Sequence, residues 1–213
     1  YLAGHSWGSV IGVLAVKKYP QFYRAYIGIG QMVNAIENER LSYLWTLERA
    51  MQMQEAEPVR KLRDIGMPPY TGNWLKKTIT QRELLSRYGG AWYAHLNRGL
   101  SQLFDGAQNA TEYTRLEKLN YMSGVTHSMQ ILWPQIMSVN LMKQATKLQV
   151  PVFLMMGRHD YMTPFVLAEQ YYAALEAPHK ELIWFENSAH FPYLEEADKF
   201  NKILAEKILP ETS

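Results

Sequence analysis

Three absences narrow the interpretation of this 213-residue sequence. It contains no cysteine, which excludes disulfide bonds, thiolate metal sites and a cysteine nucleophile. Its longest apolar runs, at residues 10–16 and 152–156, are much shorter than the roughly 20 residues that span a bilayer, so we expect no transmembrane helix. Like charges form no block: 22 Lys and Arg against 20 Asp and Glu give a net charge of +2, which disfavours a nucleic-acid partner.

Short apolar segments predict buried parallel strands at residues 25–29 and 151–157. Residues 1–3 are typical of the end of a strand, and residues 181–185 indicate a further strand. Helical spacing predicts helices at residues 10–19, 164–176 and 193–209. The first strand starts at Tyr1 with no initiator methionine and no leader, so we expect the chain to begin part-way through a fold. The absence of cysteine fits a cytoplasmic location.

Residues 34–147 show no convincing strand and carry helical patterns at 34–53, 74–88 and 113–120. Two strand–helix units, a helical insertion and two more strand–helix units indicate an α/β fold: a partial doubly wound parallel sheet with an inserted helical cap. The sequence thus predicts a core at residues 1–33, a cap at 34–147 and the rest of the core at 148–213.

A candidate nucleophile lies between the first strand and the first helix. Gly4-His5-Ser6-Trp7-Gly8 fits the pattern G-x-S-x-G, in which a serine sits on a strained strand-to-helix turn. The following helix points its N-terminus at Ser6, where its partial positive charge favours a developing oxyanion. The alternative is a purely structural Gly-Ser turn.

A serine hydroxyl needs a base, and His190 is the strongest candidate because it follows the last predicted strand on the same sheet edge as Ser6. Asp160, directly after the preceding strand, is the natural orienting carboxylate. The three candidates follow in the chain order Ser, Asp, His. Other histidines fit less well, since one should point away from the turn and the rest lie in helical or surface segments: His5, His95, His127 and His179.

Metal and cofactor sites are not indicated. His159 stands next to Asp160, but no further His, Asp or Glu has ligand spacing. Gly28 and Gly30 resemble the start of a dinucleotide loop, but Val33 occupies its third glycine position, so we expect no nucleotide cofactor.

Three motifs give the chain a resemblance to the C-terminal part of the α/β-hydrolase fold, and most to the proline iminopeptidase group of cap-bearing serine hydrolases. They are G-x-S-W-G at residues 4–8, G-R-x-D-x-x-T-P at 157–164 and S-A-H-F-P at 188–192. The resemblance implies acyl-enzyme chemistry, whereas the dehalogenases and epoxide hydrolases of this fold have an aspartate in place of Ser6. Related esterases, lipases and C–C bond hydrolases share the motifs, so they do not identify the substrate.

In that fold the serine turn follows the fifth strand, so the resemblance implies that four strands are missing here. The strand at residues 1–3 would then have a free edge, able to pair with another chain or with the missing N-terminal part. The missing part would also supply the second oxyanion donor, which leaves only the backbone N–H of Trp7. Losing one donor typically costs about 10²–10³ in rate, so we expect this chain alone to be weak or inactive.

The leading hypothesis is a serine hydrolase acting on a small ester or short peptide, with a slight preference for an aminopeptidase by resemblance. The alternative is a noncatalytic binding or interaction module of the same fold. Some cap aromatics should line an apolar pocket: Trp45, Trp74, Tyr88, Trp92, Tyr93, Phe104, Tyr113, Tyr121 and Trp133. An aminopeptidase also needs a buried cap carboxylate for the substrate ammonium, and the candidates by location are Glu37, Glu39, Glu48, Glu55, Glu112 and Glu117.

Overall fold

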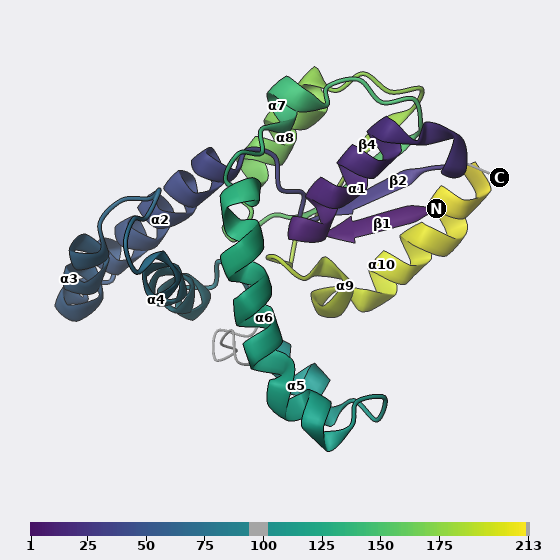
Figure 1. Cartoon of the computed structure of the whole chain (residues 1–213). Coiled ribbons are helices and arrows are strands. Elements are labelled where there is room, and N and C mark those ends of the chain that lie inside the picture. Colours follow the sequence, from purple (N-terminus) through teal and green to yellow (C-terminus); the bar gives the residue numbers. More distant parts are fainter. Residues whose placement is uncertain (94–101, 212–213) are drawn as a thin grey trace.

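The computed structural model describes residues 1–93 and 102–211, whose arrangement is drawn in Figure 1. The sheet region contains β1 (Leu2–His5), α1 (Trp7–Lys18), the 3₁₀ helix η1 (Pro20–Phe22), β2 (Tyr26–Ile29), β3 (Val152–Gly157), α8 (Phe165–Ala174) and β4 (Lys180–Phe185). After β4 follow α9 (Pro192–Glu195), α10 (Ala197–Ile203), the π-helical turn η2 (Leu204–Ile208) and α11 (Leu209–Glu211). Between β2 and β3 lie α2 (Ala35–Gln52), α3 (Ala56–Ile65), α4 (Trp74–Arg87), α5 (Gln102–Asn109), α6 (Arg115–Ile136) and α7 (Leu141–Gln144).

The sheet is parallel throughout and has the strand order β1-β2-β3-β4. Its register pairs His5 with Ile29, and Gly157 with Phe185, so the carboxyl ends of all the strands lie along one edge. Open α/β sheets place their binding sites at this edge. The predicted fold class is confirmed, and β1 is the end strand among the described residues. The pairing of its outer edge with another chain or with a further part of the protein stays a prediction.

Apolar cores lie on both faces of the sheet, which explains why the two central strands, β2 and β3, are fully buried and read as continuous apolar runs. Successive residues of a strand point to opposite faces. Tyr26 and Leu154 thus pack with α1 and α8 on one face. Ile27 and Phe153 belong to the core on the other face, which includes residues of α10 and η2.

The helices between β2 and β3 have a small core of their own, formed by residues of α2, α3 and α4, among them Tyr43, Leu62 and Leu84. Figure 1 shows α2–α4 grouped away from the sheet, with α6 standing between that group and β1. A stack of Trp74 on Trp133, with ring centroids 5.1 Å apart, joins α4 to α6. Because sequence comparison does not test the expected boundaries at residues 33/34 and 147/148, they stay predictions.

Some predicted helices differ from the structure. Helix α3 is not among the predicted helices. Its Pro58 lies in the first turn, where the missing N–H costs nothing. The pattern at residues 113–120 is only the start of α6, which begins with a Thr114–Glu117 capping box and contains Pro134. The single helix expected at residues 193–209 is interrupted at Glu196, whose carboxylate instead accepts hydrogen bonds from the segment after β4.

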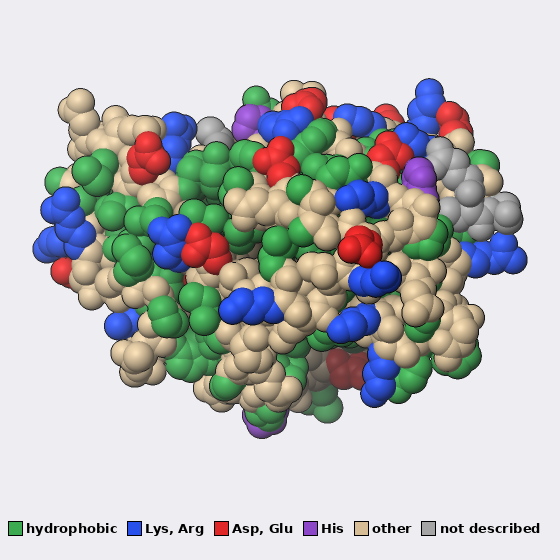
Figure 2. Space-filling model, turned by 90° about the horizontal axis from the view of Figure 1, so that it is seen from above, with side chains coloured by type: hydrophobic (Ala, Val, Ile, Leu, Met, Phe, Trp, Pro, Cys, Tyr) green, Lys and Arg blue, Asp and Glu red, His purple; other side chains and the backbone are tan. Residues whose placement is uncertain are grey.

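Two sequence expectations concern the charge of the surface and the membrane-spanning capacity of the helices. Figure 2 shows Lys and Arg side chains interspersed with acidic ones over the face it displays, without a patch of one sign. In residues 1–93 and 102–211, the helices lack the combination of length and apolar character that crossing a bilayer requires.

We predict that Gly157→Ala lowers the free energy of unfolding by about 2 kcal/mol, because overpacking of a tight site typically costs that much. A Cβ at residue 157 would lie 1.9 Å from the carbonyl oxygen of Ala189. The matched control is Gly124→Ala in α6, where nothing lies within 4 Å of the new Cβ. That variant should be about 0.5–1 kcal/mol more stable, as Ala replaces Gly in a helix. Urea denaturation measures both, and equal effects would contradict the prediction.

Candidate active site

Ser6 occupies a strained turn at the carboxyl end of β1. It has φ 56° and ψ −125° and precedes the first residue of α1. A positive φ is uncommon for a residue other than glycine, and such strain persists only where the surroundings fix it. Here the Ser6 N–H donates to the carbonyl of Ile29 at 3.0 Å, and the N–H of Ser9 donates to the carbonyl of Ser6 at 3.0 Å.

Asp160 and His190 form a buried pair at the same sheet edge. The His190 Nδ1 lies 2.9 Å from Asp160 Oδ2, and the side chains are 3% and 0% exposed. This contact fixes the hydrogen on Nδ1, because a carboxylate accepts, and leaves Nε2 as an acceptor. Gly30 makes room for the pair: at its φ of 51° a Cβ would lie 3.0 Å from His190 Nδ1 and 3.3 Å from Asp160 Oδ2.

Thr163 completes the surroundings of the carboxyl group. Its backbone N–H donates to Asp160 Oδ1 at 2.8 Å, and its hydroxyl donates to Oδ2 at 2.7 Å. The same hydroxyl lies 3.2 Å from His190 Nδ1. The sequence motif contained this threonine, but its role depends on a turn after β3 that spacing alone does not reveal.

Ser6 and His190 both belong to the described part of the chain, and no hydrogen bond joins their side chains. The two are nevertheless neighbours in space, since the ring of His5 lies 4.5 Å from the ring of His190. Bonds between a nucleophile and its base are often long in structures without substrate. The structure thus joins Asp160 to His190 and places Ser6 at the same edge, and the roles assigned to the three residues stay a prediction.

His5 is packed, but the expectation that it points away from the site is wrong, because its ring lies against the predicted base. Its Nε2 lies 2.8 Å from the carbonyl oxygen of His190, and its ring also contacts Phe191 and Tyr193. Burial, and to a lesser extent the nearby His190, lowers the pKa of His5 from 6.5 to about 4. The ring is therefore neutral at pH 7 and can donate a hydrogen bond from Nε2.

The other histidines lie elsewhere. His159 stacks on Tyr93 with ring centroids 3.8 Å apart, His179 lies beside Phe153, and His127 is exposed. His95 lies outside the described residues. Within the ranges 1–93 and 102–211, no group of three or more His, Cys, Asp or Glu side chains could hold a metal ion.

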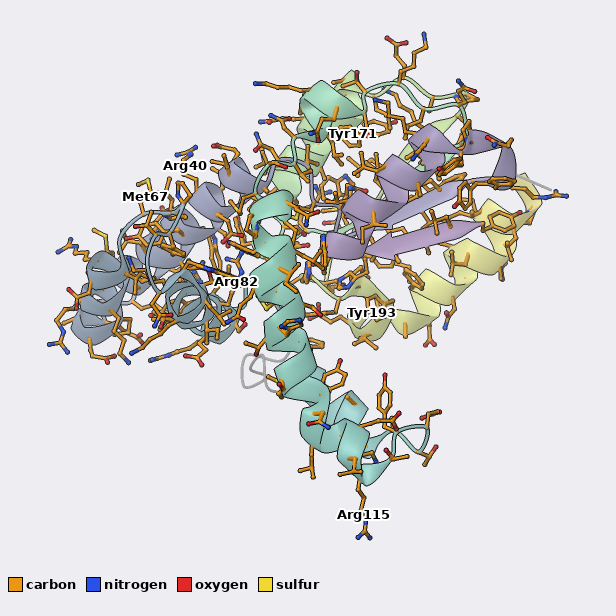
Figure 3. The ribbon with its side chains drawn as sticks, in the orientation of Figure 1. Arg40, Met67, Arg82, Arg115, Tyr171 and Tyr193 are labelled. Atoms are coloured by element: carbon orange, nitrogen blue, oxygen red, sulfur yellow. The ribbon has the colours of Figure 1, made fainter. Side chains whose placement is uncertain are left out.

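Ser6 and Trp7 open into a cavity of about 270 Å³ between the sheet edge and the cap. Trp7 is the first residue of α1, where backbone N–H groups have no partner within the helix and can face an anion. The cap contributes side chains from three helices, α2, α4 and α6: Asn38, Glu39, Thr78, Arg82, Met129 and Trp133. Figure 3 shows Arg82 between α4 and α6.

Few of the expected cap residues line this cavity. Trp133 does, whereas Trp45 stacks on Tyr161 and Trp92 stacks on Phe191. The Phe104 side chain lies outside the described part of the structure. Of the six glutamates, Glu39 is the one that lines the cavity among described residues, and it forms a buried ion pair with Arg82.

We predict that His5 makes the protein less stable in acid. The unfolded chain binds a proton at pKa 6.5 and the folded chain only near 4, so stability is lost as the pH falls through this window. Between pH 7 and about pH 4.5 the wild type should lose about 2 kcal/mol more than His5→Gln, which can still donate to His190. Urea denaturation at both pH values measures the difference. The exposed His127→Gln is the control, and a His5→Gln protein as acid-sensitive as the wild type would refute the assignment.

A family model described as serine aminopeptidase, S33, matches residues 1–197 of the chain. A Bacillus subtilis protein named probable aminopeptidase YbaC is 31% identical over 211 residues. That alignment covers 96% of this chain and 64% of the relative, so the chain spans less than two thirds of its length.

Solved structures of low sequence identity share the fold. A thermophilic esterase matches with a TM-score of 0.58 at 16% identity, over 99% of this chain and 66% of the esterase. The proline iminopeptidase of Mycobacterium smegmatis matches with a TM-score of 0.54 at 14% identity, over 97% of this chain and 64% of that enzyme.

Proposed function

Because the chain belongs to the serine aminopeptidase S33 family, we propose that it carries the acyl-transfer site of a serine hydrolase that cleaves an ester or an N-terminal peptide or amide bond. The observation that carries this proposal is the buried Asp160–His190 hydrogen bond, at the sheet edge where the strained Ser6 ends β1. A base oriented by a carboxyl group, at the same sheet edge as a serine on a strained turn, is what nucleophilic catalysis requires.

The reaction proceeds in two halves. His190 Nε2 takes the proton of the Ser6 hydroxyl as its oxygen attacks the substrate carbonyl carbon, and the Trp7 N–H stabilises the oxyanion. His190 then gives the proton to the leaving alcohol or amine, which departs and leaves the acyl group on Ser6. A water molecule, deprotonated by His190, attacks the ester and releases the acid. Asp160 stabilises the imidazolium in both halves.

The substrate is a small molecule that fits the cavity of about 270 Å³ beneath the cap. Trp133 and Met129 provide apolar surface there, and Asn38 and Arg82 provide polar groups. Turnover of an aminoacyl arylamide would identify the peptidase branch of the proposal, and cleavage confined to carboxylic esters would identify the esterase branch.

A noncatalytic binding module remains the competing function, and the missing Ser6–His190 hydrogen bond within the described residues favours it. We predict that a fluorophosphonate labels the protein at Ser6, because a base-activated hydroxyl reacts where ordinary serines do not. Ser6→Ala should abolish labelling and lower ester hydrolysis by at least about 10³-fold. Intact-protein mass spectrometry measures the adduct, with the exposed Ser138→Ala as control. A wild-type protein that stays unlabelled would support the binding module.

We further predict that residues 1–213 alone hydrolyse an activated ester about 10²–10³ times more slowly than a longer protein containing them, the usual effect of one missing oxyanion donor. Two observations support this prediction. The alignment covers only 64% of the Bacillus subtilis relative, and the Trp7 N–H is the one oxyanion donor that we assign within the described residues. The two polypeptides are compared at equal concentrations of titrated active serine. Matching rates would show that the described residues supply the whole oxyanion site.

A further inference from the structure

Two buried polar side chains of the cap line the Ser6 cavity, and each has one polar atom without a hydrogen-bond partner among the described residues. Asn38 of α2 is 2% exposed and Thr78 of α4 is 5% exposed. Among the described residues, Asn38 Oδ1 and Thr78 Oγ1 have no partner. Both residues line the cavity that Ser6 opens into. Buried polar atoms are nearly always hydrogen-bonded in folded proteins, so two such atoms in one cavity indicate a ligand that pairs with them.

The free atom of Asn38 is a hydrogen-bond acceptor. Its Nδ2 donates to the carbonyl oxygen of Met162 at 3.0 Å, which fixes the orientation of the amide. Oδ1 is therefore left, in a residue that lines the cavity, as an oxygen that can only accept. The Thr78 hydroxyl can accept as well as donate. The ligand must thus bring at least one N–H or O–H.

The neighbouring charges already neutralise each other. Arg82 Nη2 bonds Glu39 Oε1, and these side chains are 10% and 4% exposed. Arg82 Nη1 also donates to Ser42 Oγ at 2.9 Å and to Gln81 Oε1. A substrate ammonium would therefore meet no uncompensated carboxylate among the described residues of the cavity. Burying a charge without a counter-charge is costly, so the cavity favours an uncharged donor.

We propose that Asn38 Oδ1 and Thr78 Oγ1, beside the Arg82–Glu39 pair, form a subsite for an uncharged N–H of the substrate, as in an acylated amine. The inference rests on the proposed serine hydrolase activity and specifies its substrate class. Met129 and Trp133 give the apolar walls that receive the rest of the group. The subsite distinguishes an acylated amine from both its methylene analogue and a free amine.

The test compares three phenyl esters, those of N-acetylglycine, 4-oxopentanoic acid and glycine. The first two differ only in N–H against CH₂, and the third carries an ammonium. On the protein that contains this chain, kcat/KM for the acetylglycyl ester should exceed that for the oxopentanoyl ester by about 10-fold to 100-fold, the usual effect of leaving a buried acceptor unpaired. In Asn38→Leu the preference should fall to within about 3-fold, and the isosteric Thr78→Val should lower it about 3-fold or more.

The matched control is Ser86→Ala. Ser86 lies in α4 like Thr78 and is 1% exposed. Its hydroxyl also has no partner within residues 1–93 and 102–211, but Ser86 is not among the residues that line the cavity. Its ester preference should equal that of the wild type.

The inference is overturned if the wild type shows no preference for the acetylglycyl ester or if Asn38→Leu and Thr78→Val both retain it. It is also overturned if the glycyl ester is fastest and loses its advantage in Glu39→Gln. Failure of the proposed function looks different: Ser6→Ala would then hydrolyse all three esters as the wild type does.

Discussion

The fully buried carboxyl group of Asp160 imposes the condition on which the rest of the site depends. A carboxyl group out of contact with water must find its hydrogen bonds in the protein, and this one takes them from Thr163 and His190. The parallel register brings the turn after β3 next to the segment after β4, where His190 lies. Gly30 leaves the space that the pair occupies. The strand order and the glycine at residue 30 thus both make the hydrogen bonds of Asp160 with His190 and Thr163 possible.

The cap differs from the sheet in the side chains that it buries. The helices α2, α3 and α4 share an apolar core, yet the faces turned toward Ser6 carry charged and polar side chains. A buried ion pair such as Arg82–Glu39 gives little net stability, because desolvation offsets much of the attraction. Its place beside the nucleophile is better understood as setting the electrostatic character of the cavity. In the proposed reaction, the sheet region supplies Ser6, Asp160 and His190, and the cap supplies the polar side chains that line the cavity.

The sheet and the principal site residues could be predicted because their signals are local. The buried strands β2 and β3 are continuous apolar runs, and Ser6, Asp160 and His190 each lie in a segment that directly follows a strand. Asn38, Thr78 and Arg82 could not be predicted, since their meeting depends on how α2, α4 and α6 pack. The length of α6 was missed for a related reason: Leu116 and Leu119 are exposed, so no apolar face marks the helix. Glu39 was found only as one of six equivalent glutamates.

The bond from His5 to the backbone of His190 has a mechanical consequence. His5 is covalently next to Ser6, and its ring holds the carbonyl of a residue 185 positions away. The loop after β4 and the serine turn are therefore tied by a hydrogen bond that involves neither the Ser6 hydroxyl nor the His190 imidazole. In the proposed reaction, this bond helps to keep the two reacting side chains at the same sheet edge.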